Sequence, residues 1–497
     1  MYIDKAGIIF LISALCTTFD IDKASVMVGR LAEQRALLEA LKGDKSVMIA
    51  VIGRRRVGKT YLIEQTYDKH MAFHMIGQKD ADRDTQLANF TAKLSSYTAS
   101  GYALKEPKSW EEAFGQLRTY ISRRRSKRKK VVFFDEVPWL DTHRSGFLSA
   151  LSYFWNDWGI KNNIVLVICG SAASWMINKV VNDKGGLHNR INHLIQLEPF
   201  TLSETRAYFR KRNIRLDDHQ IAHLYMVIGG VPHYLSQVRA GKTAVETIQQ
   251  LCFDKGGSLR SEFDNLYAAL FDNPEGHIDV IKTLSKKKKG LSRKEIITYS
   301  HQSNGGGLTK ILEELKRSSF VTEYRPYGKK KRDTLYRLTD EYSLFYLKFI
   351  VGTKPVKDYW LKKSQSPSVK SWYGYAFESM CMKHVERIKA ALGISGLYTE
   401  ESSYQHKGDE SYDGIQIDLL VDRADKAIHL CEMKYYDDEV LIDKKYARQL
   451  MERKTTFRHH SKTKSFLFTT LITTYGLRTN QHSLGLIDQV ITLDQLF

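Results

Sequence analysis

The chain has 497 residues, too many for one ordinary hydrophobic core, and this length predicts about three domains. Hydrophobic residues at 42% and charged residues at 27% are typical of a soluble globular protein. The 76 Lys and Arg against 56 Asp and Glu give a net charge of +20, which favours a polyanionic partner such as nucleic acid. The five cysteines are scattered and include no C-x-x-C pair, so they indicate neither a disulfide framework nor a zinc site, and they fit a reducing cytoplasm.

The amino-terminal segment is the one unusual stretch, because residues 6–19 are mostly apolar behind Lys5. The apolar run is too short to span a bilayer, and no convincing small-residue cleavage site accompanies it. We therefore expect residues 1–26 to be a disordered leader, or a start assigned at Met1 in place of Met27. A membrane-tethered ATPase is an alternative that depends on this run alone, and we expect no stable membrane association.

From Val26 onward, short apolar strands alternate with amphipathic helices, which is the pattern of a parallel sheet with helices on both faces. A helical region follows, from Ser203 to about Leu270. The expected strands are Val47 to Ile52, Met71 to Met75, Val131 to Phe134, Ile164 to Cys169 and Leu194 to Leu197. The expected helices are Arg30 to Leu41, Thr60 to Lys69, Trp110 to Arg123 and Ser145 to Trp155.

The first of these strands runs into a glycine-bounded loop and then a helix. Its two glycines let the backbone wrap a triphosphate, while main-chain N–H groups and the helix N-terminus supply partial positive charge. Lys59 would reach the β and γ phosphates and Thr60 would hold Mg²⁺. The predicted nucleotide-binding residues are Gly53, Arg54, Arg55, Arg56, Val57, Gly58, Lys59, Thr60 and Tyr61. The stretch predicts binding of ATP or GTP.

Two adjacent carboxylates, Asp135 and Glu136, end the buried strand from Lys130. We expect Asp135 to hold the Mg²⁺ shell and Glu136 to polarise a water for attack on the γ-phosphate. The next strand ends at Ser171, which would contact the same phosphates as a sensor or simply cap a helix. Arg190 would neutralise transition-state charge, in its own subunit or in a neighbour of a homo-oligomer, or would be an ordinary surface arginine.

Past Asn273 three expected helices precede a β-hairpin, which together suggest a winged helix-turn-helix. Ser292 begins the second helix with Glu295 three residues later, as in a capping box. Two basic runs lie beside the expected recognition helix and wing. Lys286 to Lys289 precedes the helix, and Lys329 to Arg332 forms the wing tip, so we expect DNA contact there. Winged helices also bind proteins. The run Arg123 to Lys130 is interpreted as a solvated surface.

In the last part of the chain, two hydrophobic strands carry Asp418 and the pair Glu432 and Lys434. Because side chains alternate along a strand, Glu432 and Lys434 share a face. Two carboxylates suit Mg²⁺, and a lysine can orient or deprotonate a water for attack on a phosphodiester. Glu378 lies upstream of these strands, in a predicted helix that begins near Gly374. The alternative is a structural ion pair between Glu432 and Lys434.

Several motifs together resemble the archaeal-type ATPase family, which also occurs in bacteria and is related to AAA+ and STAND switch ATPases. Members often continue into a winged helix and a restriction-endonuclease-like domain. Asp418, Glu432 and Lys434 resemble the PD-(D/E)XK nuclease core, although Ile417 replaces its proline. This resemblance implies that Glu378 is the additional acid that many such nucleases place near the metal. The motifs, beyond the phosphate loop, are Val28-Gly29-Arg30 with Glu33, Phe134-Asp135-Glu136, Cys169-Gly170-Ser171, Leu197-Glu198-Pro199-Phe200 and Gly229-Gly230-Val231-Pro232.

These observations predict an α/β protein built from a P-loop parallel-sheet ATPase domain with a helical lid, a winged helix and a C-terminal α/β nuclease-like domain. The expected function is a cytoplasmic Mg²⁺-dependent ATPase switch that binds DNA and carries a nuclease-like domain, with cutting of DNA left open. The alternative is an ATP-dependent regulator whose nuclease-like domain docks partners without cutting. The predicted divisions are 1–26 (leader), 27–270 (ATPase with lid), 271–350 (winged helix), 351–370 (linker) and 371–497 (nuclease-like domain).

Overall fold

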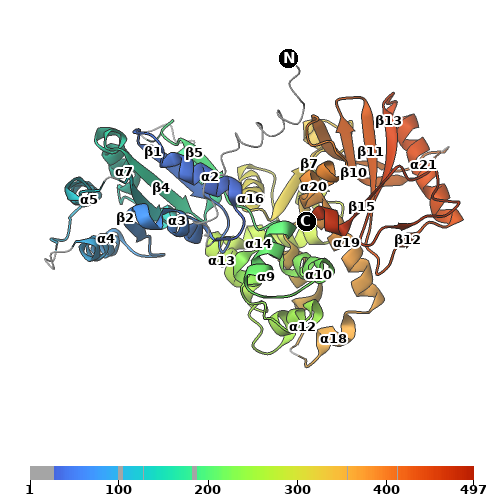
Figure 1. Ribbon diagram of the computed structural model, residues 1–497, viewed down its shortest axis with the longest axis horizontal. Helices are drawn as coiled ribbons and strands as arrows, with labels where there is room; N and C mark the ends of the chain where they lie inside the picture. Colours follow the sequence, from blue (N-terminus) through green and yellow to red (C-terminus); the bar gives the residue numbers. More distant parts are fainter. Residues whose placement is uncertain are drawn as a thin grey trace, which may run out of the picture. The chain divides into compact units, whose positions relative to one another are not determined.

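The computed structural model describes residues 27–98, 104–126, 128–181, 187, 189–271, 273–354, 356–410 and 412–497 (Figure 1). The predicted leader, residues 1–26, lies outside the described residues. The chain divides into two compact units. Of the described residues, the first unit contains 27–50, Lys59–Cys169 and Asn189–Ile195, and the second contains Val51–Gly58, most of 170–188, and Gln196–Phe497. The boundary therefore passes through the phosphate loop.

A five-stranded sheet with the order β2-β3-β4-β1-β5 forms the core of the first unit. Its strands are β1 (Val47–Ile52), β2 (Met71–Ile76), β3 (Lys130–Asp135), β4 (Ile164–Gly170) and β5 (His193–Gln196). The pairs β2-β3 and β3-β4 are parallel. Every residue of β4 is buried, which explains why this strand is a continuous apolar run without polar alternation. The expected parallel sheet is confirmed.

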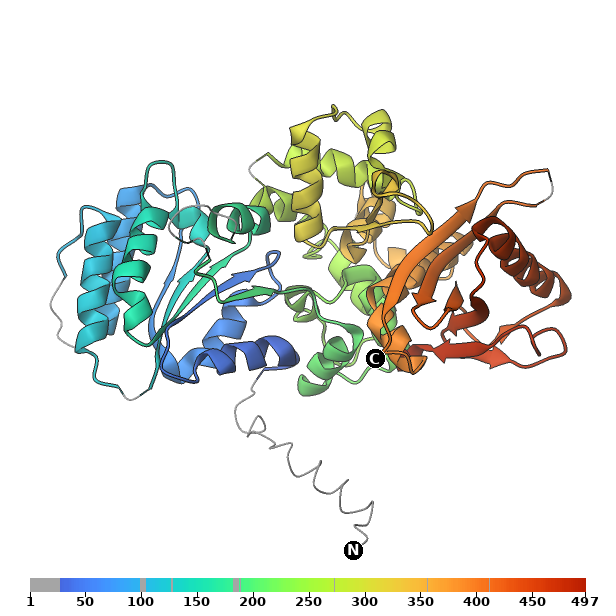
Figure 2. The ribbon, with the colours of Figure 1, turned by 90° about the horizontal axis from the view of Figure 1, so that it is seen from above.

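Helices flank this sheet, as Figure 2 shows for the blue to teal part of the chain. Helix α2 packs on α3, and α5 packs on both α4 and α7. Helix α4 was not expected from the sequence; Asp82 caps it, and its buried side chains include Leu87, Phe90 and Leu94. The helices are α2 (Leu31–Ala40), α3 (Lys59–Tyr67), α4 (Arg83–Tyr97), α5 (Trp110–Arg123), α6 (Val137–Leu140) and α7 (Phe147–Asp157).

The second unit begins with helices around one hydrophobic core that extends into the C-terminal sheet. Short helix α8 (Ala173–Met176) precedes them. Tyr234 and Tyr267 are fully buried in this core. The helices that follow are α9 (Leu202–Lys211), α10 (Asp218–Ile228), α11 (Pro232–Leu235), α12 (Ala244–Ile248) and α13 (Glu262–Leu270).

A small mixed segment follows, with three helices and three short strands in the order α14-β6-α15-α16-β7-β8. Its sheet has the order β6-β8-β7 with antiparallel pairs. Ser292 and Glu295 form the expected capping box at the start of α15. The elements are α14 (Pro274–Ser285), β6 (Leu291–Ser292), α15 (Arg293–Tyr299), α16 (Gly306–Arg317), β7 (Val321–Tyr324) and β8 (Leu335–Leu338).

The segment 351–370, which we expected to be a linker, contains ordered structure. Helix α18 (Tyr359–Lys363) lies within it, and Trp360 is completely buried between the rings of Phe253, Phe345 and Phe349. Helix α17 (Glu341–Phe345) precedes it and α19 (Pro367–Lys383) begins inside it. Aromatic burial therefore holds this segment against the rest of the second unit.

The C-terminal sheet has the order β15-β13-β11-β10-β9. Pairs β9-β10 and β10-β11 are antiparallel, whereas β11-β13 and β13-β15 are parallel. Leu419, Val421, Cys431 and Met433 join the core that contains α19, while Leu420 and Leu430 pack with Phe457 of α21, so these helices cover opposite faces. The elements are β9 (Thr399–His406), β10 (Ile415–Arg423), β11 (Ala427–Lys434), β13 (Phe466–Thr473), β15 (Gln489–Thr492), α20 (Val385–Ala391) and α21 (Lys444–Ser461), with a second small sheet of β12 (Val440–Leu441) and β14 (Leu477–Arg478).

Among the described residues, no helix combines the length and the apolar character needed to cross a bilayer.

Candidate functional sites

The first site lies where α3 begins beside the carboxyl end of β3. Lys59 is the first residue of α3 and is buried. The Thr60 hydroxyl donates a hydrogen bond to the Asp135 carboxylate, although 75 residues separate them. A hydroxyl and a carboxylate oxygen side by side at a helix N-terminus are hard oxygen ligands of the kind that Mg²⁺ prefers. These residues therefore fit a Mg²⁺ ion.

Glu136 follows Asp135 in a backbone conformation that few non-glycine residues adopt. Its φ of 48° and ψ of 50° lie in the left-handed region, and it precedes helix α6. Its backbone N–H donates to Asp135 Oδ1 at 2.9 Å. Strained backbone of this kind concentrates at functional sites, where the surrounding structure maintains it.

Cys169 lies at the end of the neighbouring strand β4 and is fully buried. Burial raises the pKa of its thiol, and the nearby Asp135 carboxylate raises it further. The thiol therefore stays neutral beside two carboxylates and a lysine. Because the thiol is uncharged, the charge at this end of β4 comes from Lys59, Asp135 and Glu136.

The phosphate loop itself is anchored inside the second unit. A Cβ atom at Gly53 would clash with the Leu197 carbonyl oxygen, so only glycine fits there. Arg54 pairs with Asp340, which directly precedes α17, and both side chains are almost completely buried. Burial lowers the pKa of Arg54, but the Asp340 carboxylate outweighs this effect and the pKa is raised.

A second arginine of the loop, Arg56, pairs with Glu262 at the start of α13. The Arg54 guanidinium also stacks over the Phe320 ring, 4.5 Å from its centroid. Sequence reasoning placed Arg54 and Arg56 around the nucleotide but did not find Asp340 or Glu262. Their distance along the chain, more than 200 residues, leaves no local signal.

The remaining predicted nucleotide residues differ in exposure. Arg55 and Tyr61 are exposed, whereas Val57 is buried. Ser171 is buried immediately after β4, and Arg190 is exposed shortly before β5. The described contacts do not assign a role to Ser171 or Arg190.

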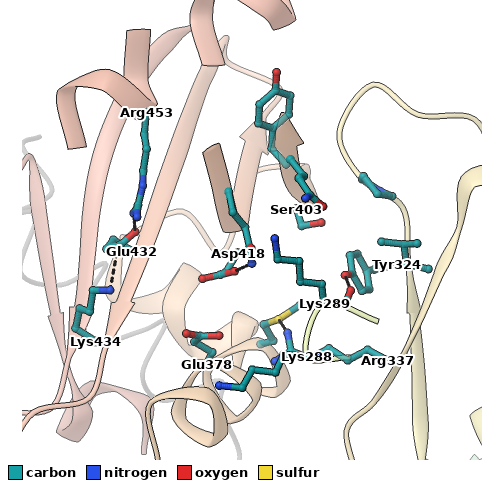
Figure 3. Close-up of a pocket in the computed structure, with 16 residues that line it drawn as sticks. Lys288, Lys289, Tyr324, Arg337, Glu378, Ser403, Asp418, Glu432, Lys434 and Arg453 are labelled. Carbon is teal, nitrogen blue, oxygen red and sulfur yellow. Dashed lines mark hydrogen bonds and ion pairs between the residues drawn. The ribbon is translucent and has the colours of Figure 1, made fainter. Parts of the chain in front are cut away.

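The second site is a cavity of about 300 Å³ beside the C-terminal sheet (Figure 3). It brings together all four residues predicted there, Glu378 from α19, Asp418 from β10, and Glu432 and Lys434 from β11. Strands β10 and β11 are antiparallel and Leu419 pairs with Cys431, so Asp418 and Glu432 are the next residues on from that pair, one on each strand. The pairing of β10 with β9 shifts register between Ile417 and Leu420, an irregularity that often re-aims a side chain near a site.

Basic and phenolic groups already hold the Glu432 carboxylate. Lys434 Nζ lies 2.9 Å from Glu432 Oε1, Arg453 forms an ion pair with the other oxygen, and Tyr446 donates a hydrogen bond of 2.9 Å. Burial raises the pKa of Glu432, but Lys434 and Arg453 outweigh it and the pKa is lowered. Figure 3 shows Glu432 directed to these bases, apart from Asp418 and Glu378. The three acids do not form a compact ligand set, because their oxygens do not all lie within 4.8 Å of one another.

Glu378 and Asp418 form the more acidic side of the cavity. Burial raises the pKa of Glu378 to about 7, with a further contribution from the charge of Asp418. Gln416 donates a hydrogen bond to Asp418. Two neighbouring carboxylates repel each other when both are ionised, and a divalent cation bound by both offsets this repulsion. The donor set of Glu378 and Asp418 therefore fits Mg²⁺, with Glu432 available only if it leaves Arg453.

The cavity also contains cations that sequence reasoning did not assign to it. Lys288 and Lys289 belong to the basic run before β6, and Arg337 extends from β8. On α21 the contacts to Glu432 come from Tyr446 and Arg453, seven residues apart and so on one helix face. A spacing of seven residues from Tyr446 along one helix face is the sequence signal that could have identified Arg453.

The expected wing is only partly exposed. Tyr327 at the turn donates its backbone N–H to Ser403 of β9 at 2.7 Å, and its ring packs against Phe457 of α21. Lys329 to Arg332 remain exposed, as do Thr309 and Lys310 on α16. The hairpin therefore contacts the C-terminal sheet, while its basic tip stays exposed.

The first site and its parallel sheet define the class of protein, a P-loop ATPase fold. Residues 27–238 match the family described as an ATPase domain predominantly from Archaea. The match ends before α12 and does not reach the cavity of the C-terminal sheet. The expected resemblance is thus confirmed for the nucleotide-binding part of the chain.

Similar proteins extend over more of the chain. A protein of Methanocaldococcus jannaschii named "Uncharacterized protein MJECL04" is 22% identical over 435 residues, which cover 86% of this chain and 92% of the relative. The solved Walker-type ATPase PABY2304 of Pyrococcus abyssi has a TM-score of 0.49 and 19% identity, and covers 65% of this chain and 96% of its own. The ORC2 protein of Aeropyrum pernix has a TM-score of 0.37 and 14% identity, covering 64% and 93%. With TM-scores below 0.5, the two structures carry no conclusion about substrates or partners.

Proposed function

We propose that the protein is a Mg²⁺-dependent ATPase whose nucleotide state controls a DNA-binding segment and a nuclease-like C-terminal domain. The observation that carries the ATPase proposal is the hydrogen bond from Thr60 to Asp135 at the N-terminus of α3. Loop amides and Lys59 bind the phosphates, Thr60 and Asp135 would hold Mg²⁺, and Glu136 orients the attacking water. Mg²⁺ would neutralise charge on the β and γ phosphates.

Variants at Lys59 and Glu136 test the ATPase proposal separately. Lys59→Ala removes the ammonium that meets the phosphates, so we expect nucleotide affinity to fall at least roughly 100-fold. Glu136→Gln keeps the shape and removes the base, so we expect binding to persist while turnover falls roughly 100-fold or more. Binding is measured by titration with a fluorescent ATP analogue and turnover by phosphate release. Lys105→Ala, in an exposed position, is the control; hydrolysis at the wild-type rate in Glu136→Gln would refute the role of that residue.

For the segment α14 to β8, we propose a winged helix that contacts DNA. Support comes from the order of its helices and strands, its antiparallel three-stranded sheet, and the exposed basic side chains of Lys329 to Arg332. Affinity for duplex DNA should fall with rising salt, and alanines at Lys329 to Arg332 should lessen that salt dependence. A salt dependence identical to wild type would favour a protein partner.

For the cavity at the C-terminal sheet, we propose hydrolysis of phosphodiesters. Glu378 and Asp418 would hold Mg²⁺, Lys434 would orient the attacking water, and Lys288, Lys289 and Arg337 would neutralise the phosphate charge. Support comes from the acidic and basic side chains of six separate segments, which meet in one cavity. The bound ion would polarise the phosphodiester and stabilise the charge that develops on it.

One observation favours a second function, a regulator that does not cut. Glu432 is held by Lys434, Arg453 and Tyr446, so neither it nor Lys434 is positioned as a ligand or a base in this arrangement. Plasmid DNA incubated with Mg²⁺ or Mn²⁺, with and without ATP, separates the two functions. Cutting that disappears in Lys434→Ala supports the nuclease; the absence of cutting on duplex and single-stranded substrates supports the regulator.

We further propose that the protein is cytoplasmic. Its subunit number is measured by mass determination of the purified protein.

A further inference from the structure

Three segments of the C-terminal domain meet at a group of nitrogen and oxygen ligands that neither function above uses. His406 ends β9, Asp409 lies in the turn before β10, and His460 lies in the last turn of α21. One ligand atom from each residue lies within 4.8 Å of the other two. Within the part of the chain that the structure describes, no other group of three His, Cys, Asp or Glu residues meets this condition.

The spacing of these atoms matches the coordination sphere of a transition metal. Asp409 Oδ2 lies 3.4 Å from His406 Nε2 and 3.3 Å from His460 Nε2. A tetrahedral ion with bonds of about 2.0–2.1 Å separates its ligand atoms by roughly 3.3–3.4 Å. The two separations from the carboxylate therefore leave the space that one such ion requires.

The two imidazole nitrogens also need a partner. Both Nε2 atoms are buried, and neither makes a hydrogen bond within the described residues despite its proximity to Asp409. A buried polar atom without a hydrogen bond is unfavourable, and an ion between the two rings would satisfy both. The rings are stacked, with centroids 3.8 Å apart and planes inclined by 23°. Because a shared ion lies in the plane of each ring, binding would rotate the rings from this arrangement.

We propose that His406, Asp409 and His460 bind one Zn²⁺ ion, or another divalent transition metal, that fastens the β9–β10 turn to the end of α21. Two imidazole nitrogens and one carboxylate favour Zn²⁺ over Mg²⁺, which prefers oxygen ligands. Asp409 also lines an open cavity of about 690 Å³ that includes Glu410 and Asp413. This acidic opening gives a cation access to the site and leaves the fourth ligand position to water.

The site is separate from the proposed phosphodiester cavity. His406, Asp409 and His460 do not line the cavity that contains Glu378 and Asp418. The adjacent His459 stacks on Tyr412 with ring centroids 4.7 Å apart and lies outside the ligand group. His459 therefore provides a matched control, because it is the same residue type one position away on the same helix.

The test uses the full chain purified without a histidine tag, stripped with a chelator and titrated with Zn²⁺ against a chromophoric competitor. We expect one equivalent to bind tightly, more tightly than at the oxygen-only sites proposed above, and we expect His406→Ala and His460→Ala each to weaken this binding at least roughly 100-fold. His459→Ala and Asp418→Asn should bind as wild type does. Co²⁺ substitution should give the visible absorption of a tetrahedral site in the wild type and in His459→Ala.

X-ray absorption of the zinc-loaded wild type tests the ligand set without any substitution, so a variant that fails to fold does not decide the result. Imidazole nitrogens and oxygens at about 2.0–2.1 Å are expected. Substoichiometric binding, sulfur in the coordination sphere, or equal affinity in His460→Ala and His459→Ala would overturn the proposal.

Discussion

Two sets of ion pairs in the second unit show how burial separates a structural role from a ligand-binding one. Arg54 of the phosphate loop pairs with Asp340, with side chains only 1% and 3% exposed. In the C-terminal cavity, Glu432 pairs with Lys434 and Arg453, which are 33% and 28% exposed. Asp340 is distant from Arg54 in the sequence, whereas Lys434 lies on the same strand as Glu432 and Arg453 comes from α21. Only the second pair is accessible to a ligand.

The difference follows from the cost of separating charges in each environment. A buried ion pair is expensive to break, because the remaining charge is left without water. A partly exposed pair exchanges its partner for water or for an incoming ion at little cost. Arg54 and Asp340 therefore fix the shape of the loop, whereas Arg453 is a partner that a metal ion could replace.

Asp340→Asn should give the largest effect, because it removes the charge but keeps the shape. Asn at this position can still accept the hydrogen bond that Ser343 N donates to Asp340 Oδ2 at 2.8 Å. The buried Arg54 guanidinium would lose its counter-charge, and we expect the free energy of unfolding to fall by roughly 3 kcal/mol. Urea-induced unfolding followed by fluorescence measures the loss.

Asp264→Asn on the exposed side of α13 serves as the control and should change stability by less than about 0.5 kcal/mol. Nucleotide affinity of Asp340→Asn should also fall, because the loop conformation depends on Arg54. Equal stability in the two variants would remove the distinction between the buried pair and the exposed pairs.

The loop and the strands of the first unit could be predicted from sequence because their signals are local. The phosphate loop is one uninterrupted stretch, and the apolar runs of β1, β3 and β4 stand out without any alignment. Helix α4 escaped prediction because its buried leucines and phenylalanine stand among polar residues, including the buried Gln86. Periodicity is weak where a helix buries only a narrow stripe.

The partners of the charged residues could not be predicted, since they depend on tertiary contacts. Asp340 lies 286 residues from Arg54, and nothing in its neighbourhood indicates a loop partner. The acids of the C-terminal cavity were found from strand alternation, but the bases that hold Glu432 depend on how α21 lies across the sheet. The ligand group of His406, Asp409 and His460 likewise could not be predicted from the sequence, because 54 residues separate its two histidines and no metal motif links them.

A buried histidine sharpens the comparison, because it is held by hydrogen bonds without a charged partner. His384 Nδ1–H donates to the Met380 carbonyl at 2.8 Å, and Leu202 N donates to Nε2 at 3.0 Å. Burial lowers its pKa from 6.5 to about 4. The unfolded chain therefore binds a proton that the folded chain does not, and stability present above pH 6.5 is lost as pH falls toward 4.

His384→Ala should cost about 2–3 kcal/mol at pH 7.5, and the difference from wild type should shrink by pH 5. Urea unfolding at several pH values measures both quantities. His301, whose side chain is 95% exposed, offers the control His301→Ala. The Asp340→Asn loss should not vary between pH 5 and 8, because both partners of that pair stay ionised; a pH-independent cost in His384→Ala would show that its role is packing alone.

Arg453→Gln should give the smallest change in stability, less than about 1 kcal/mol, because the ion pair with Glu432 is partly exposed. Its effect should appear in ligand binding. Without the guanidinium, Glu432 can join Asp418 and Glu378 around a divalent ion, and we expect Mn²⁺ affinity to rise about 10-fold. Mn²⁺ titration followed by electron paramagnetic resonance, in the absence of nucleotide, measures this gain. The gain should vanish in the double variant with Asp418→Asn; if it persists there, the ion binds elsewhere, and if affinity does not rise at all, Arg453 stabilises the cavity as firmly as Asp340 stabilises the loop.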